Sequence, residues 1–380
     1  MKSFGARAAG QRLERMRASA QWVEGTPASA AGFRNRGPIR PGLRDNAAPR
    51  PTLTEFLCGG NRRVPAGTLP VVDPLVSWRR PAGRELRATW LGHSTVLLEL
   101  GSARLLTDPV WGVRASPSRL AGPRRFHPMP VSLRDLPPLD AVLISHDHYD
   151  HLCMATVREL ARRQPGTAFI TSLGVGAHLE AFGIASERII ELDWWESHVV
   201  SGTEVRLTAT PSQHFSGRGL KDRNATLWSG FVIEDGRQRV FFSGDTGLTD
   251  QYTEIRRRWG GGTPFDLVML EVGAWHPSWG DIHLGPGNAL EALALLGGGA
   301  FLPVHWSTFS LALHAWDEPA ETLLELAPQQ GVQLVMPRPG EAVRPADSDG
   351  VRPWWRGVDT RSAGPPEVLS WPKAMPFPLD

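Results

Sequence analysis

Residues 145–151 constrain this chain more than any other segment. They read Ser-His-Asp-His-Tyr-Asp-His and end an apolar run that begins at Ala141 and predicts a buried strand. Imidazole nitrogens and carboxylate oxygens are ligands that zinc and similar divalent metals take in proteins. In a turn that leaves a strand, His146 and His148 can converge on one ion, while Asp150 and His151 face a second position. The alternative interpretation is a polar surface loop that binds nothing.

Polar residues stand just beyond three other predicted strands as well. The carboxyl ends of strands in an α/β sheet converge on one crevice, where ligands bind. Taken singly, a histidine there is more often an ordinary buried residue. Taken together, these residues complete two ligand sets with positions left open, as in catalytic sites. We expect His146, His148 and His214 on one metal ion, Asp150, His151 and His305 on the other, and Asp245 between the two.

The pattern from residue 84 onward alternates between short strands and helices. The predicted strands are 89–91, 95–100, 103–107, 141–145, 168–171, 205–209, 228–234, 239–243, 265–271, 300–304 and 332–336, and the predicted helices are 154–163, 173–182, 288–296 and 319–326. Meanders of strands mixed with strand–helix units predict an α/β fold, a layered sandwich with helices outside the sheets.

Charge and proline divide the chain of 380 residues into three parts. Residues 1–83 are expected to form a basic, proline-rich arm that is extended on the surface or flexible. The first 80 residues carry a net charge of +9 and the other 300 carry −7. Residues 84–346 are the expected main domain, and residues 347–380 a tail rich in proline and tryptophan. The overall net charge of only +2 disfavours a nucleic-acid binder.

Cysteine content and hydropathy indicate the compartment. Two distant cysteines, Cys58 and Cys153, cannot form a disulfide framework, so a reducing interior is favoured. We expect Cys153 to pack near the helix after His151 rather than to bind metal. No run approaches the roughly 18 apolar residues of a spanning helix, and the basic N-terminus lacks the apolar segment of a signal peptide. A cytoplasmic protein is therefore expected.

The order His-x-His-x-Asp-His, then His, Asp and His, resembles the metallo-β-lactamase-fold hydrolases. The resemblance narrows to the family of N-acyl-phosphatidylethanolamine-hydrolysing phospholipase D. The more specific runs are Glu-Leu-Asp-Trp-Trp-Glu at 191–196 and His-Trp-Ser-Thr-Phe at 305–309. Further supporting runs lie at 90–95, 107–109, 114–117, 136–138, 210–214 and 241–247. The similarity extends from about residue 89 to residue 341, with weaker traces near residues 19–35.

The resemblance implies a four-layer αββα sandwich with two Zn²⁺ ions per chain, with Mn or Fe as the alternative metals. It implies that a hydroxide held between the ions attacks a phosphodiester in an N-acylated phosphatidylethanolamine or a related phospholipid. The products would be a phosphatidic acid and an N-acylethanolamine. Asp245 as a bridging carboxylate favours phosphodiesterases and thioesterases of this superfamily over true β-lactamases.

Four residues carry the implied catalytic roles: Asp150, Asp245, His283 and Asp108. Asp108 matches a family aspartate, which either orients a ligand histidine or is only a turn residue. His283 matches a family histidine that either donates to the phosphate or leaving oxygen or has no role. Two residues depart from the family pattern in ways that concern the choice of substrate. Ile282 stands where a glutamine is expected, and Glu271 places a charge at the end of a strand expected to be apolar.

Two other functions stay open on the sequence alone. One is a lactonase or phosphodiesterase that acts on a small soluble substrate, and the other is a non-catalytic metal-dependent binding or sensor protein. Several of the 15 tryptophans either form a surface for the membrane interface or pack in the core and loops. They are Trp194, Trp195, Trp275, Trp279, Trp354 and Trp355. Peripheral membrane contact, helped by attraction of the basic arm to anionic lipid, stays open, as does the oligomeric state.

Overall fold

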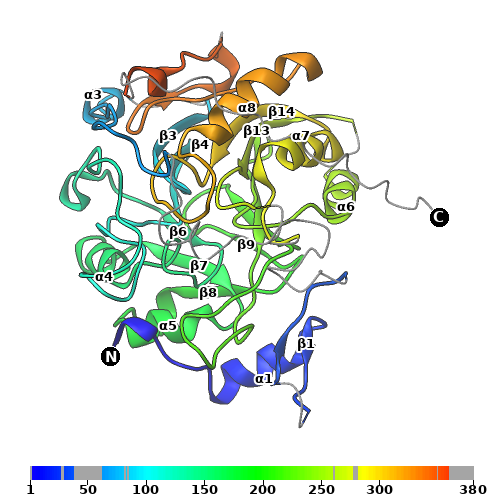
Figure 1. Cartoon of the computed structure of the whole chain (residues 1–380). Coiled ribbons are helices and arrows are strands. Elements are labelled where there is room, and N and C mark those ends of the chain that lie inside the picture. Colours follow the sequence, from blue (N-terminus) through cyan, green and yellow to red (C-terminus); the bar gives the residue numbers. More distant parts are fainter. Residues whose placement is uncertain are drawn as a thin grey trace.

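The computed structural model of the chain describes residues 2–26, 30–37, 62–80, 83, 85–259, 262–276, 281–348 and 350–358. Its main feature is a pair of mixed β-sheets that pack face to face, with helices on their outer sides (Figure 1). This arrangement confirms the expected α/β sandwich. The division of the chain at residues 83 and 346 stays a prediction.

The first sheet has seven strands in the order β15, β3, β4, β5, β6, β7, β8. Their bounds are Arg87–Gly92 (β3), Thr95–Leu100 (β4), Ala103–Thr107 (β5), Ala141–Ile144 (β6), Ala168–Ser172 (β7), Ile189–Leu192 (β8) and Ala342–Val343 (β15). Strand β4 is buried on both faces: Leu97 lies in the cluster beneath the outer helices, whereas Val96 and Leu98 lie in the large core. Helices α4 (Met154–Arg163) and α5 (Val175–Ala181) cover this outer face.

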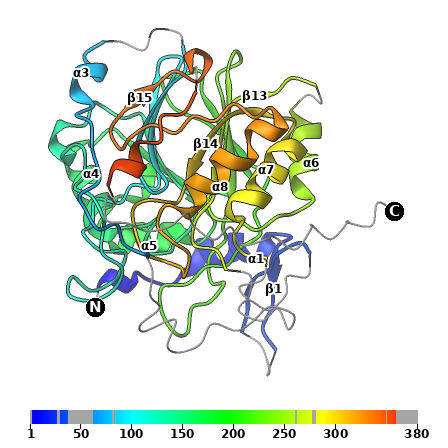
Figure 2. The same ribbon diagram turned by 45° about the horizontal axis from the view of Figure 1, so that its top comes forward.

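The second sheet has six strands in the order β14, β13, β12, β11, β10, β9. Their bounds are Ser197–Val199 (β9), Arg206–Thr210 (β10), Gly230–Glu234 (β11), Arg239–Phe242 (β12), Phe265–Glu271 (β13) and Gly299–Val304 (β14). Helices α6 (Gln251–Arg258), α7 (Gly285–Leu296) and α8 (Glu318–Leu326) lie side by side along it (Figure 2). Leu290, Leu293 and Leu323 of these helices belong to the large core that also contains the strand side chains.

The strands that lead to candidate ligands run in one direction within each sheet. β5 to β8 pair in parallel, and β3 has the same direction because both β3 and β5 are antiparallel to β4. β12, β13 and β14 pair in parallel, and β10 joins them because both β10 and β12 are antiparallel to β11. The loops after these strands meet at one edge of the sandwich, as expected for a ligand site.

The described part of the basic arm has regular structure and packs on the sandwich (blue in Figure 1). It contains a 3₁₀ turn (Lys2–Phe4), helix α1 (Gly10–Ala18) and the paired strands β1 (Trp22–Val23) and β2 (Gly32–Phe33). Met16 and Phe33 are buried together with Leu173, Leu227 and Trp228. Of the two expectations for the arm, residues 2–26 and 30–37 favour a segment laid on the sandwich over a flexible one, but residues 10–18 are helical rather than extended. The arm's prolines from Pro27 to Pro51 lie outside the described residues.

Some other sequence expectations differ from the structure. Residues 332–336 are not a strand, because only an isolated bridge joins Leu334 to Phe301 at the edge of β14. The strands β8, β9 and β15 and the helix α6 were not expected. Within the described residues, the remaining short helical segments are α3 (Leu75–Trp78) and 3₁₀ turns at Leu133–Asp135, Ser186–Arg188, Pro328–Gln330, Pro345–Asp347 and Trp354–Gly357.

The tryptophans mostly serve packing. Trp194 and Trp275 are each 5% exposed and Trp355 is 0% exposed, so a membrane-facing role is wrong for these three. Trp354 and Trp355 pack on Trp306 in the large core, which ties residues 350–358 to the sandwich. Trp279 and Cys58 lie outside the described residues. No helix within the described ranges is both long enough and apolar enough to cross a membrane.

Candidate metal centre

The candidate ligands stand where the parallel strands end. The residues at or just beyond these ends are His93 (β3), Asp108 (β5), His146 (β6), His214 (β10), Asp245 (β12), Glu271 (β13) and His305 (β14). His93, Asp108 and His305 have φ values of 53°, 32° and 65°, which residues other than glycine rarely adopt. Such residues turn the chain sharply as it leaves the sheet. Backbone strain of this kind is concentrated at functional sites.

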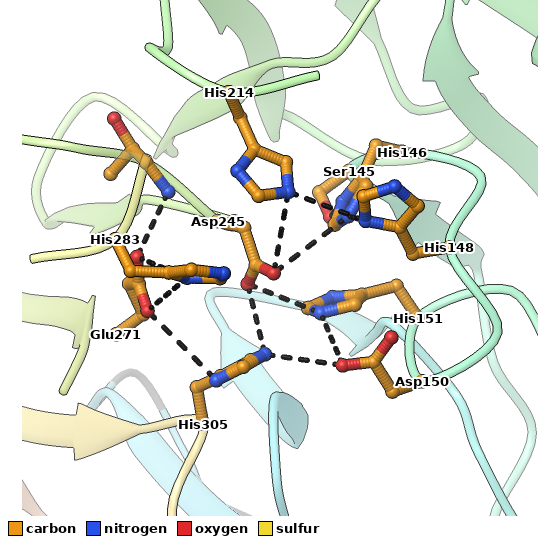
Figure 3. A network of polar contacts seen from close by, with 12 residues as sticks. Ser145, His146, His148, Asp150, His151, His214, Asp245, Glu271, His283 and His305 are labelled. Carbon is orange, nitrogen blue, oxygen red and sulfur yellow. Dashed lines mark hydrogen bonds and ion pairs between the residues drawn. The ribbon is translucent and has the colours of Figure 1, made fainter. Parts of the chain in front are cut away.

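The first group of ligand atoms comes from His146, His148, His214 and Asp245, all within 4.8 Å of one another (Figure 3). His148 Nδ1 lies 2.8 Å from His146 Nε2 and 3.3 Å from His214 Nε2. Burial lowers the pKa of His146 and of His214 well below the ordinary value. These imidazoles are therefore neutral and have lone pairs to offer a metal.

The second group of ligand atoms comes from Asp150, His151 and His305, joined by His93. Asp150 Oδ2 lies 3.2 Å from His305 Nε2 and 3.0 Å from His93 Nε2. Asp245 Oδ1 lies 3.1 Å from His151 Nε2 and 3.2 Å from His305 Nε2, whereas its Oδ2 faces the first group. The structure thus brings together all seven predicted ligands, with one Asp245 oxygen directed at each group (Figure 3).

The donor set fits two divalent cations. His151 Nε2 and Asp245 Oδ1 are buried at the meeting point and form no hydrogen bond with any residue in the described ranges. Burial lowers the pKa of His305, but the charges of Asp245 and Asp150 outweigh this effect and raise the pKa to about 10. These carboxylates therefore create a strongly negative field. Divalent ions would neutralise that field and bind the buried nitrogen and oxygen atoms that form no hydrogen bond. Nitrogen and oxygen donors of this kind suit zinc, manganese and iron alike.

Asp108 is fully buried behind His151. Its Oδ2 lies 2.7 Å from His151 Nδ1 and accepts the Ser145 hydroxyl at 2.7 Å, while its Oδ1 accepts the Ser145 N–H at 2.7 Å. A proton on Nδ1 leaves Nε2 free for a metal, as in the carboxylate–histidine–metal arrangement. Of the two alternatives for Asp108, this placement favours orientation of a ligand histidine.

Glu271 and His283 form a buried pair beside the first group. His283 Nδ1 lies 3.0 Å from both carboxylate oxygens of Glu271, which also accepts the N–H groups of Thr246 and Leu284 at 3.1 Å. The His283 ring points from Glu271 toward Asp245 (Figure 3). Burial lowers the pKa of His283, but the charge of Glu271 outweighs this effect and raises the pKa above its ordinary value. Glu271, an unexplained charge in the sequence, is thus the partner of a candidate catalytic histidine.

Two residues of the centre were missed as site residues from the sequence, His93 and Glu271. Both stand at the end of a strand that is parallel to the ligand-bearing strands, so the rule that found His214 and His305 would have found them. Burial and the nearby His305 lower the pKa of His93 to about 3, and its Nε2 bonds to Asp150. Cys153 stands at the residue before α4, makes no capping bond with its side chain, and belongs to none of the ligand groups among the described residues.

Comparisons with known proteins fit this arrangement. Residues 103–306 match the family model described as the beta-lactamase superfamily domain. The chain is 43% identical over 327 residues to an uncharacterised protein of Mycobacterium tuberculosis, covering 85% of this chain and 86% of that protein. It is 38% identical over 250 residues to N-acyl-phosphatidylethanolamine-hydrolyzing phospholipase D 1 of Caenorhabditis elegans, covering 63% of this chain and 69% of that relative.

Solved structures share the fold. An isothiocyanate hydrolase from Delia radicum gut bacteria is 21% identical, with a TM-score of 0.54 over 68% of this chain and 98% of that chain. At this identity the likeness concerns the fold alone. The family model and the worm relative show that the chain is a metallo-hydrolase of the β-lactamase superfamily, and it belongs to the family of N-acyl-phosphatidylethanolamine-hydrolysing phospholipase D.

Proposed function

We propose that this protein is a two-metal, zinc-dependent phosphodiesterase of the phospholipase D type. Its substrate is an N-acyl-phosphatidylethanolamine or a related phospholipid. Water adds to the phosphorus, the bond from phosphorus to the ethanolamine oxygen breaks, and the products are a phosphatidic acid and an N-acylethanolamine. The observation that carries the proposal is Asp245, whose two oxygens face separate ligand groups. The printed name of the worm relative supports the choice of substrate.

The residues of the site would have distinct roles in binding metal and activating water. His146, His148 and His214 would hold one ion, Asp150, His151 and His305 the other, and Asp245 both. Bound ions supply a water acidic enough to act as a nucleophile near neutral pH and a positive charge for a phosphoryl oxygen. Asp108 holds the proton on His151 Nδ1.

His283 is the proposed proton donor to the leaving oxygen. Its Nδ1 faces Glu271, so its Nε2 is left for the substrate. The raised pKa keeps this imidazole protonated at higher pH than an ordinary histidine. The leaving ethanolamine oxygen then departs as a neutral alcohol rather than as an alkoxide.

Contact with the surface of a membrane is part of the proposal, because the substrate is a bilayer lipid. The net charge of +9 in the first 80 residues supports attraction to anionic lipid, although Arg12 and Arg15 are used in pairs with the chain's own glutamates. Such attraction weakens as salt rises.

The test is hydrolysis of N-acyl-phosphatidylethanolamine in vesicles by the zinc-loaded protein, with products read by mass spectrometry. We expect both products in equal amounts, about two zinc ions per chain by elemental analysis, and loss of at least 100-fold in rate for Asp245→Asn and for His148→Ala. Arg162→Ala, on the exposed side of α4, is the matched control and keeps full activity.

Three outcomes would count against the proposal. Full activity after complete removal of metal would exclude the two-metal mechanism. Cleavage of bis-(p-nitrophenyl) phosphate or a lactone without any cleavage of the lipid, together with no sedimentation on anionic vesicles at low salt, would instead support an enzyme for a small soluble substrate. A metal-loaded protein that hydrolyses none of these substrates would favour the binding or sensor function.

A further inference from the structure

We propose that Asn35, in the N-terminal segment of residues 30–37, is a positioning residue for the metal centre. Its side-chain amide fixes the peptide of the candidate ligand His214. The proposal rests on the metal centre of the proposed function but not on its substrate. It makes the N-terminal segment a structural part of the centre, although this segment lies about 180 residues before His214 in the chain.

The side chain of Asn35 binds both backbone groups of His214. Asn35 Nδ2 donates to the His214 carbonyl at 2.8 Å, and the His214 N–H donates to Asn35 Oδ1 at 3.0 Å. The indole N–H of Trp228 also donates to Asn35 Oδ1, at 3.2 Å. One amide therefore replaces the neighbouring strand that His214 lacks, since β10 ends at Thr210. His214 is 1% exposed, so without Asn35 its peptide groups would be buried and unpaired.

The ring of His214 is fixed separately from its backbone. His214 Nδ1 donates to the carbonyl of Ile282 at 2.9 Å, which leaves Nε2 facing His148 and Asp245. The carbonyl of Ile282 sets the rotation of the ring, and Asn35 sets the position of the backbone that carries it. Because a metal ligand acts only from the correct position, both supports decide how well His214 can bind an ion.

Asn35 is itself held by packing. Phe33, two residues earlier, is 0% exposed and meets the ring of Trp22 edge to face at a centroid distance of 5.2 Å. The Phe33 N–H donates to the carbonyl of Asn224 at 2.9 Å, and the Arg34 N–H donates to that of Gln21 at 2.9 Å. The Asn35 amide is therefore delivered by a docked, hydrogen-bonded element rather than by a loose loop.

Residues 2–6, at the start of the same basic arm, reach another ligand-bearing loop. The carbonyl of Ser3 accepts two bonds from Arg218, at 2.9 and 3.2 Å, and Arg218 donates to the carbonyls of Asp147 and Leu152. The Ala6 N–H donates to His178 Nδ1 at 3.1 Å, and His178 Nε2 lies 3.3 Å from Asp147 Oδ2. Asp147 stands between His146 and His148, so residues 2–6 and the segment of residues 30–37 together support two of the three loops of the first ligand group.

Docking of the N-terminal segment and metal binding at the first site should each strengthen the other. If the docked segment strengthens metal binding, bound metal must stabilise the docked segment by the same free energy. Loss of the Asn35 amide should thus weaken the first metal site, formed by His146, His148, His214 and Asp245, and leave the second site, formed by Asp150, His151 and His305, nearly unchanged.

The experiment compares zinc and cobalt binding by the full-length metal-free protein and its Asn35→Ala, Asn35→Asp and Arg36→Ala variants. Arg36 is the matched control, because it neighbours Asn35 but stacks on Trp194 and Trp195 and bonds to Gln251 instead of His214. We expect Asn35→Ala to weaken one of the two sites about 10- to 100-fold in competition with a chelator, with a change in the visible spectrum of the cobalt form. Asn35→Asp keeps the acceptor but loses the donor, so its loss is intermediate.

Thermal unfolding in the absence of metal separates positioning from folding. A purely structural role would lower the melting temperature and leave the affinity and cobalt spectrum of the folded variants unchanged, which would overturn the proposal. Equal weakening in Arg36→Ala would also overturn it, because docking in general rather than the amide would then be responsible. If Asn35→Ala does not fold, Asn35→Asp decides the question by the same criteria. Metal binding is read without substrate, so failure of lipid hydrolysis in the wild type would leave this result intact.

Discussion

Three histidines of the centre are held on the side away from the metal or substrate position by a group that fixes the proton on Nδ1. Nδ1 of His151 faces Asp108 at 2.7 Å, and Nδ1 of His214 faces the Ile282 carbonyl at 2.9 Å. Nδ1 of His283 faces Glu271 at 3.0 Å. The proton on Nδ1 leaves Nε2 for a metal or for the substrate. The residue types of the site are visible in the sequence, whereas these partners depend on the packing of distant segments.

At the same scale, Glu271→Gln should change the pH profile of hydrolysis. A proton donor is active while protonated, so activity is lost as pH rises through its pKa. Because the Glu271 charge raises the pKa of His283, its removal lowers that pKa and moves the alkaline limb of the profile to lower pH. We expect His283→Ala to lose about 100-fold or more in kcat and to lack this limb. Steady-state rates between pH 6 and 10 measure both effects.

A double variant that combines Glu271→Gln with His283→Ala tests whether Glu271 acts through His283 or on the neighbouring His305. His305 Nδ1 lies 3.9 Å from Glu271. If Glu271 acts through His283, Glu271→Gln adds little to the loss already caused by His283→Ala. Fully multiplicative losses, or an unshifted alkaline limb in the single variant, would contradict the assigned role. Metal content measured in parallel detects any effect through His305.

At the scale of elements, the sequence predicts those that carry a strong pattern. β4, β5, α4 and β13 have the expected bounds, because alternating or continuous apolar runs end at turn residues. Helix α6 was missed since only Tyr252 and Ile255 are buried in it, and β8 was missed because Glu191 interrupts its apolar run. Residues 332–336 have the composition of a strand but meet the sheet at a single bridge. Pairing partners decide such cases, and one sequence does not contain them.

Arg12 pairs helix α1 with two glutamates of the sandwich. Arg12 donates to Glu180 at 2.7 Å and to Glu191 at 2.5 Å, and Glu191 also accepts the N–H groups of Gly174 and Gly176 at the start of α5. Glu191 is 9% exposed, so Arg12→Ala leaves a buried carboxylate without its cation. We expect a loss of about 1 to 3 kcal/mol in the free energy of unfolding, measured with urea.

Arg15→Ala is the matched control for this loss, since it removes an arginine of the same helix. Arg15 and Glu196 are each 47% exposed, so their pair should contribute less than about 1 kcal/mol. Equal losses in the two variants would show that burial of Glu191 is not the deciding factor. A loss of helix α1 alone, seen as proteolysis near residue 20 without a change in the main unfolding transition, would mean that the arm docks independently of the sandwich.

At the scale of the whole molecule, the metal centre joins the two sheets. The first ligand group combines His146 and His148 from the loop after β6 with His214 and Asp245 from the second sheet. The second group combines Asp150 and His151 from that same loop with His305 beyond β14. Each bound ion would therefore act as a crosslink between the sheets, in addition to neutralising buried carboxylates.

Removal of metal should consequently destabilise the entire sandwich rather than one loop. A ligand that binds only the folded state at 100 times its Kd adds about 2.7 kcal/mol per site to the free energy of unfolding. We expect a chelator to lower the urea midpoint followed by tryptophan fluorescence, and added zinc to restore it. His148→Ala, which lacks one ligand of the first group, should lose less on chelation than the wild type. An identical midpoint with and without metal would contradict the crosslink, because ions that join the sheets must favour the folded state.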